Sequence, residues 1–95
     1  MIKASGIQGK YLEYKGLPLV RQGNEIYYGD MSDKYYLFLF IMEYKKDTTL
    51  NIDLPTKVMV QICASADGKV EKNTIRDNLY DAFDIGVAWL ERYNR

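Results

Sequence analysis

Residues 35–44 read Tyr-Tyr-Leu-Phe-Leu-Phe-Ile-Met-Glu-Tyr and carry bulky apolar side chains on both of their alternating faces. A half-exposed strand shows a polar residue at every second position, and this segment does not. We therefore expect residues 34–44 to form the central strand of a sheet, with other protein elements packed against each of its two faces.

Shorter segments with strand character lie on both sides of this one. They are separated by turn signals, among them the hairpin dipeptide Gly23-Asn24 and the polar residues 29–33. Residues 45–56 read as a longer loop that either carries a short irregular strand or tucks three apolar side chains under the sheet, and 64–72 read as another loop. The expected strands are residues 10–14, 17–22, 25–28, 34–44 and 57–63.

The last part of the chain shows helical periodicity. Thr74 followed by Asp77 matches a capping-box variant, so we expect the helix to begin there. Its apolar arc covers more than half of the circumference, although a helix lying on one sheet needs only about 100°. The arc comprises Ile75, Leu79, Tyr80, Ala82, Phe83, Ile85, Gly86, Val87, Trp89, Leu90 and Tyr93.

This order of elements predicts an α+β fold with two layers, an antiparallel sheet of four to five strands with one C-terminal helix packed on it. The 95 residues suffice for one domain, which we place at residues 10–95 behind a flexible tail of residues 1–9. One helix covers only one face of a sheet, so the surplus of apolar surface predicts a homodimer. The expected dimer interface comprises Tyr36, Phe38, Phe40, Ile85 and Trp89.

Charge and composition exclude several classes of protein. The 13 basic and 13 acidic residues are interspersed, without the basic excess typical of a nucleic-acid binder. The chain has no histidine and only one cysteine, Cys63, which excludes Ser-His-Asp and Cys-His catalysis and a cysteine-based zinc site within one chain. We expect no enzyme activity, no cofactor and no metal.

The chain also lacks the signals of a membrane or exported protein. No apolar run approaches the roughly 18 residues of a membrane-spanning helix, and the first residues lack the apolar core of a signal peptide. These patterns predict a cytoplasmic protein that contacts neither membrane nor nucleic acid.

A polar turn with tyrosines on both sides is the candidate contact surface. Tyrosine is enriched in interface hot spots, and tyrosine pairs flank residues 29–33. The alternative is that the Asp and Ser side chains only hydrogen-bond the backbone of the turn. The candidate contact residues are Tyr28, Asp30, Ser32, Asp33 and Lys34.

Three stretches carry a resemblance to a family of short, uncharacterised bacterial proteins. They are residues 14–21 (Tyr-Lys-Gly-Leu-Pro-Leu-Val-Arg), residues 28–35 (Tyr-Gly-Asp-Met-Ser-Asp-Lys-Tyr), and residues 79–86 (Leu-Tyr-Asp-Ala-Phe-Asp-Ile-Gly) with 89–92 (Trp-Leu-Glu-Arg). The resemblance implies a bacterial or phage source and a stand-alone small domain. It implies no catalytic residues, and the loop 64–72 is shorter than in such relatives.

The leading hypothesis is therefore a small non-catalytic interaction protein that acts by protein–protein contact, as a homodimer or on a larger partner. A more specific version is a phage or mobile-element inhibitor of a bacterial defence system. A second hypothesis is a small-ligand module with an aromatic pocket of Tyr27, Tyr36, Phe38 and Trp89. A third is a carboxylate enzyme that would gather Asp30, Asp33, Asp81 or Asp84 in one cleft.

Overall fold

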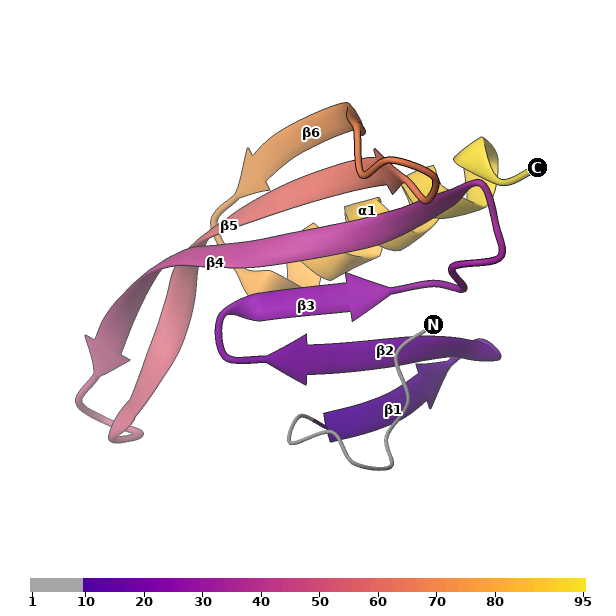
Figure 1. Cartoon of the computed structure of the whole chain (residues 1–95). Coiled ribbons are helices and arrows are strands. Elements are labelled where there is room, and N and C mark those ends of the chain that lie inside the picture. The colour runs from indigo at the N-terminus through magenta and orange to yellow at the C-terminus, as the bar shows by residue number, and fades with distance from the viewer. Residues whose placement is uncertain (1–9) are drawn as a thin grey trace.

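A computed structural model describes residues 10–95, which form a six-stranded antiparallel sheet with one helix packed on it (Figure 1). The strands lie in the sheet in the order in which they occur in the sequence, so each pairs with its neighbour along the chain. The elements are β1 (Lys10–Tyr14), β2 (Leu17–Gln22), β3 (Glu25–Tyr28), β4 (Tyr35–Asp47), β5 (Ile52–Ala64), β6 (Val70–Arg76) and α1 (Leu79–Tyr93). The predicted α+β fold with a C-terminal helix on an antiparallel sheet is confirmed, and the tail predicted for residues 1–9 lies outside the described residues.

The hairpin signals in the sequence mark real turns. Gly23 has a φ of +63°, a left-handed conformation that glycine adopts without steric cost. It joins β2 to β3 so that Gln22 pairs with Glu25, as a two-residue Gly-Asn hairpin requires. This register carries through the sheet, because Glu25 in turn lies opposite Phe40 of the central strand.

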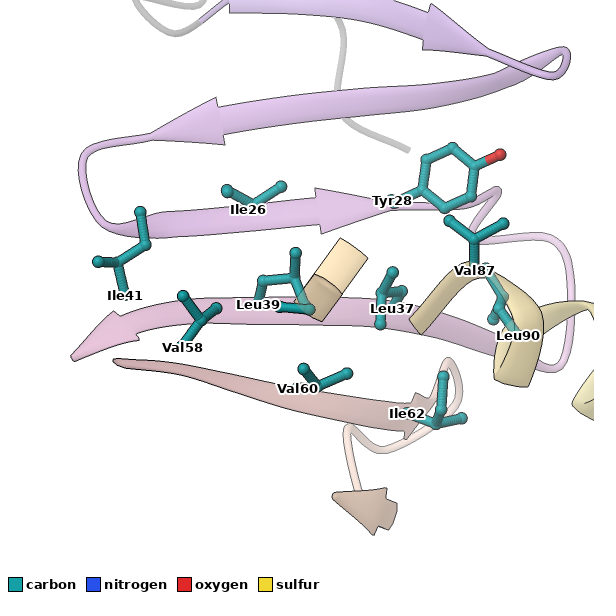
Figure 2. Close-up of a cluster of buried hydrophobic side chains, with 11 residues drawn as sticks. Ile26, Tyr28, Leu37, Leu39, Ile41, Val58, Val60, Ile62, Val87 and Leu90 are labelled. Atoms are coloured by element: carbon teal, nitrogen blue, oxygen red, sulfur yellow. The ribbon is translucent and has the colours of Figure 1, made fainter. Parts of the chain in front are cut away.

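The core lies between the helix and one face of the sheet. On β4 the alternating residues Leu37, Leu39 and Ile41 are buried, and each pairs with a buried partner on β5. Figure 2 shows these side chains facing the helix, and the core is completed by Ile26, Tyr28, Val58, Val60, Ile62, Ala82, Val87 and Leu90. Each fully buried aliphatic side chain stabilises the fold by about 1.5–3 kcal/mol.

The sheet has six strands, so the prediction of four to five is wrong. Residues 70–76, expected to be partly loop and partly helix, form the edge strand β6 and pair with β5. Most β6 side chains are exposed, and Val70 and Ile75 are the only apolar residues in it. An edge strand this polar has no clear period-2 pattern, which is why the sequence does not reveal it.

The helix begins later than predicted. Its N-cap is Asn78, whose Oδ1 accepts a hydrogen bond from the Asp81 backbone N–H at 2.8 Å, while Asn78 Nδ2 donates to Asp81 Oδ2 at 2.9 Å. The expected cap, Thr74, lies in β6. Two overlapping signals of the same spacing exist, Thr74 with Asp77 and Asn78 with Asp81, and the second is the one that starts the helix.

Strands β4 and β5 are each 13 residues long and extend past their neighbours as a two-stranded arm (Figure 1). Pairing with β3 stops at Phe40 and pairing with β6 stops at Val58, so residues 42–57 pair only with each other. Of the two alternatives for the loop 45–56, the irregular strand is therefore confirmed. The arm exposes five large apolar side chains, Met42, Tyr44, Leu50, Ile52 and Leu54.

No helix within residues 10–95 is long and apolar enough to cross a bilayer.

Candidate functional site

The helix covers one face of the sheet, and the opposite face carries a cluster of aromatic side chains. Strand side chains alternate between faces, so residues next to the buried core positions of β3, β4 and β5 point away from α1. No helix or strand of residues 10–95 lies over them (Figure 1). We call this surface the uncovered face, and its residues are Val20, Tyr27, Tyr36, Phe38, Phe40, Met59, Gln61 and Cys63.

Aromatic rings in contact form the middle of the uncovered face. The ring centroids of Tyr27 and Phe38 lie 5.1 Å apart, and those of Tyr27 and Tyr36 lie 6.5 Å apart. All three rings are half-buried against one another, whereas Val20 beneath them is buried. Contacts of this kind restrict the orientation of the rings, so the middle of the uncovered face is an apolar surface of packed aromatic side chains.

The tyrosine and cysteine side chains of the uncovered face are uncharged at neutral pH. Burial, together with a hydrogen bond of 2.9 Å from the Tyr27 hydroxyl to Glu25 Oε1, raises the pKa of Tyr27. Burial also raises the pKa of Tyr36, with a smaller contribution from Cys63. Burial raises the pKa of the Cys63 thiol, which makes it a weak nucleophile. The arrangement is therefore suited to binding by apolar contact and to neutral hydrogen bonds from tyrosine.

The polar turn predicted as a contact surface is organised by its own side chains. Asp30 Oδ1 accepts hydrogen bonds from the backbone N–H and the hydroxyl of Ser32, both at 2.9 Å. These two bonds, the backbone one first, hold the pKa of Asp30 below its ordinary value. The Asp33 backbone N–H closes the turn by donating to the Asp30 carbonyl at 2.9 Å. Asp30 and Ser32 thus act as the turn-forming alternative describes.

Lys34 and Tyr28, two other residues of the predicted contact surface, lie in different surroundings. Lys34 is exposed and its carbonyl accepts from the Ser65 backbone N–H at 2.9 Å, which ties the turn to the loop after β5. The Tyr28 ring is only 2% exposed, and its hydroxyl donates to the Tyr14 carbonyl at 2.7 Å inside the core layer. Tyr28 is therefore not part of the exposed surface beside this turn.

The predicted dimer-interface residues lie on two sides of the molecule. Tyr36 and Phe38 belong to the uncovered face together with Phe40, whereas Ile85 and Trp89 lie on the helix and pack against the core. The Trp89 ring is capped by Lys72, whose Nζ lies 4.5 Å from the ring centroid. Within one copy of the chain, Trp89 lies on the helix side of the sheet and the other predicted pocket residues lie on the opposite side, so the four side chains do not line one pocket between helix and sheet. The cavity beside Tyr27 and Tyr36 is about 10 Å³, the size of a single water site.

Two of the four carboxylates proposed for an enzyme have local structural roles. Asp81 Oδ2 accepts a hydrogen bond from the N-cap residue Asn78, and Asp30 is part of the turn between β3 and β4. Among the residues that the structure describes, no three His, Cys, Asp or Glu side chains come together to hold a metal ion.

One part of this surface follows from the sequence and another does not. Met59 and Gln61 extend the uncovered face onto β5, as their alternation with the apolar residues of that strand predicts. Val20 was not expected there, because β2 contains a proline and reads as an edge strand.

Comparison of the chain with protein-family models, with curated proteins and with solved structures finds no match in any of the three.

Proposed function

We propose that this protein is a non-catalytic interaction module that binds another protein through the uncovered face of its sheet. One observation carries the proposal: contacting aromatic rings of Tyr27, Tyr36 and Phe38 stand on the side of the sheet opposite the helix. Aromatic residues and methionine are enriched at the centres of protein interfaces, and charged residues are depleted there. The middle of the uncovered face has this composition.

The chemistry of the face supports binding rather than catalysis. The hydroxyls of Tyr27 and Tyr36 and the thiol of Cys63 have raised pKa values, so none of them is ionised at neutral pH. A raised pKa makes the thiol a weaker nucleophile and the phenols weaker general bases at that pH.

A second copy of the chain is the partner that we propose first. Two-fold symmetric homodimers are the commonest assemblies, and a flat apolar face satisfies their need for a self-complementary surface. In such a dimer the central strand would be covered on both faces, as its sequence pattern requires. A larger bacterial protein is the alternative partner. In the specific form of this alternative, the present chain is a phage or mobile-element protein that acts in the cytoplasm and inhibits a bacterial defence system.

The experiment compares two single substitutions on opposite sides of the molecule. Phe38→Ser removes an aromatic ring from the centre of the uncovered face, whereas Tyr80→Ser removes one that is 80% exposed on the helix. Sedimentation velocity over a range of concentrations measures self-association, and circular dichroism checks that both variants are folded. We expect the wild type and Tyr80→Ser to associate and Phe38→Ser to remain monomeric.

A monomeric wild type would exclude the homodimer. Affinity capture from a bacterial lysate then tests the alternative partner, with Phe38→Ser as the matched control. The proposal predicts at least one protein that the wild type captures and Phe38→Ser does not. If there is none, the uncovered face is not an interaction surface and the proposal is wrong.

A further inference from the structure

The helix leaves part of its own side of the sheet open. The backbone of α1 lies over β4, β5 and β6, and β1 and β2 have no helix behind them (Figure 1). The result is a groove of about 270 Å³ between the first turns of the helix and the first four strands. We call it the leucine groove, and its lining residues are Leu12, Leu19, Ile26, Leu39, Leu79 and Phe83, with Arg21.

Packed aromatic rings hold the leucine groove open. Phe83 of the helix contacts Tyr14 at 5.2 Å and Tyr28 at 5.5 Å between ring centroids, both edge to face. Because Tyr28 is also fixed by its hydrogen bond to the Tyr14 carbonyl, these rings set the distance between the helix and β1. The groove is a preformed part of the fold, as small-molecule sites usually are.

Among the residues that the structure describes, Arg21 is the only charged one that lines the leucine groove. Its guanidinium is held in place, because Nε donates to the Gly23 carbonyl at 3.0 Å and Nη2 donates to the Tyr44 hydroxyl at 3.1 Å. Arginine carries five N–H donors, so donors remain for another acceptor. The one ion pair within residues 10–95 joins Lys15 to Glu91, which leaves the Arg21 charge without a carboxylate partner.

From this arrangement we infer that the leucine groove binds a small amphipathic anion, a short alkyl chain that ends in a carboxylate. The chain lies against Leu19, Ile26 and Leu39, and the carboxylate accepts hydrogen bonds from Arg21. The volume of about 270 Å³ is just below the range of drug-sized pockets, about 300–1,000 Å³, so the ligand is short. This site lies on the helix side of the sheet, and the inference is independent of the proposed function of the uncovered face.

The test titrates the full-length ¹⁵N-labelled chain with octanoate, octanol and octylammonium, each below its micelle concentration. The three ligands share the alkyl chain and differ in the charge of the head group. We expect saturable amide shifts around the leucine groove with octanoate, weaker binding of octanol and the weakest binding of octylammonium, because Arg21 attracts the carboxylate and repels the ammonium group.

Two variants and a control locate the site. Arg21→Gln should weaken octanoate binding about fivefold, the range of an exposed ion pair, and leave octanol binding unchanged. Leu12→Glu places a negative charge on a side chain that is 57% exposed at the groove, and should abolish octanoate binding. Lys45→Gln removes an exposed cation from the arm and should change nothing.

The inference is overturned by the absence of saturable shifts with octanoate, by equal binding of octylammonium, or by wild-type affinity for octanoate in Arg21→Gln. Shifts confined to the uncovered face would also overturn it, and they would still be compatible with the proposed function.

Discussion

Gly86 of the helix and Leu37 of the central strand are in such close contact that no side chain fits between them. A Cβ built on Gly86 would lie 2.6 Å from Leu37 Cδ1, closer than real Cβ contacts. Leu37 is fully buried, so it can move aside only if the core around it repacks. This contact sets how closely the helix approaches the sheet.

Gly86→Ala therefore tests the packing of the two layers. Overpacking of a core costs about 1–3 kcal/mol, against a gain of about 1 kcal/mol from the better helix propensity of alanine. We expect a net loss in the free energy of unfolding, measured by urea denaturation. Ala88→Gly, on the exposed side of the same helix, measures the propensity term alone. A net gain of stability in Gly86→Ala would contradict the close contact.

The start of the helix can be tested at Asn78. Its side chain accepts from the Asp81 backbone N–H, so Asn78→Ala should destabilise the protein by about 0.5–2 kcal/mol. Asn78→Ser keeps an accepting oxygen without adding a negative charge beside Asp81, and should preserve most of the stability. Thr74→Ala is the control, because Thr74 lies in β6. A larger loss in Thr74→Ala than in Asn78→Ala would place the cap at the position that the sequence first suggested.

The turn at Asp30 should contribute to the pH dependence of stability. Hydrogen bonds from Ser32 lower the pKa of Asp30 in the folded state. A carboxylate with a lowered pKa in the folded state stabilises the fold above its unfolded pKa of about 3.9, and this contribution is lost as the pH falls through the folded value. Asp30→Asn should be less stable than the wild type at neutral pH, and the difference should shrink below about pH 4 in urea denaturation. A difference that does not depend on pH would contradict this assignment.

The thiol of Cys63 reports on the uncovered face. Burial raises its pKa, and the side chain is almost completely enclosed, so native protein should react slowly with an aromatic disulfide reagent. Unfolding in urea should restore the rate of a free cysteine, which serves as the control. Rapid reaction of the folded protein at neutral pH would show that Cys63 is accessible, contrary to the structure.

Much of the fold could be predicted because the relevant residues follow simple periodicities. The continuous apolar run of β4 and the hairpin signal at Gly23 locate the first four strands, and the periodic segment near the end of the chain locates the helix. Strand β6 was missed because its side chains are mostly polar and exposed, so neither face has a pattern to recognise. A strand that is stabilised mainly through backbone hydrogen bonds to the sheet needs no particular pattern of apolar residues, so it is hard to predict from the sequence.

The candidate site was predicted only in part, for a physical reason. Adjacent tyrosines on a strand point to opposite faces, and the sequence does not say which member of a pair faces the helix. Tyr28 proves to be buried under the helix, whereas Tyr27 is on the uncovered face. Likewise Trp89 and Phe38 are both large and apolar, but their separation by the sheet follows from where the helix packs.

The order of strands in the sheet has a consequence for how the chain reaches its native state. Since every strand pairs with the next one in sequence, each new hairpin can be added to an existing edge with only a short loop to close. The helix follows all six strands along the chain, so it is synthesised after them and then excludes water from the inner face of the sheet. We expect ribosome-bound chains from which the helix has not yet emerged to hold a loosely ordered sheet with its apolar inner face exposed to water.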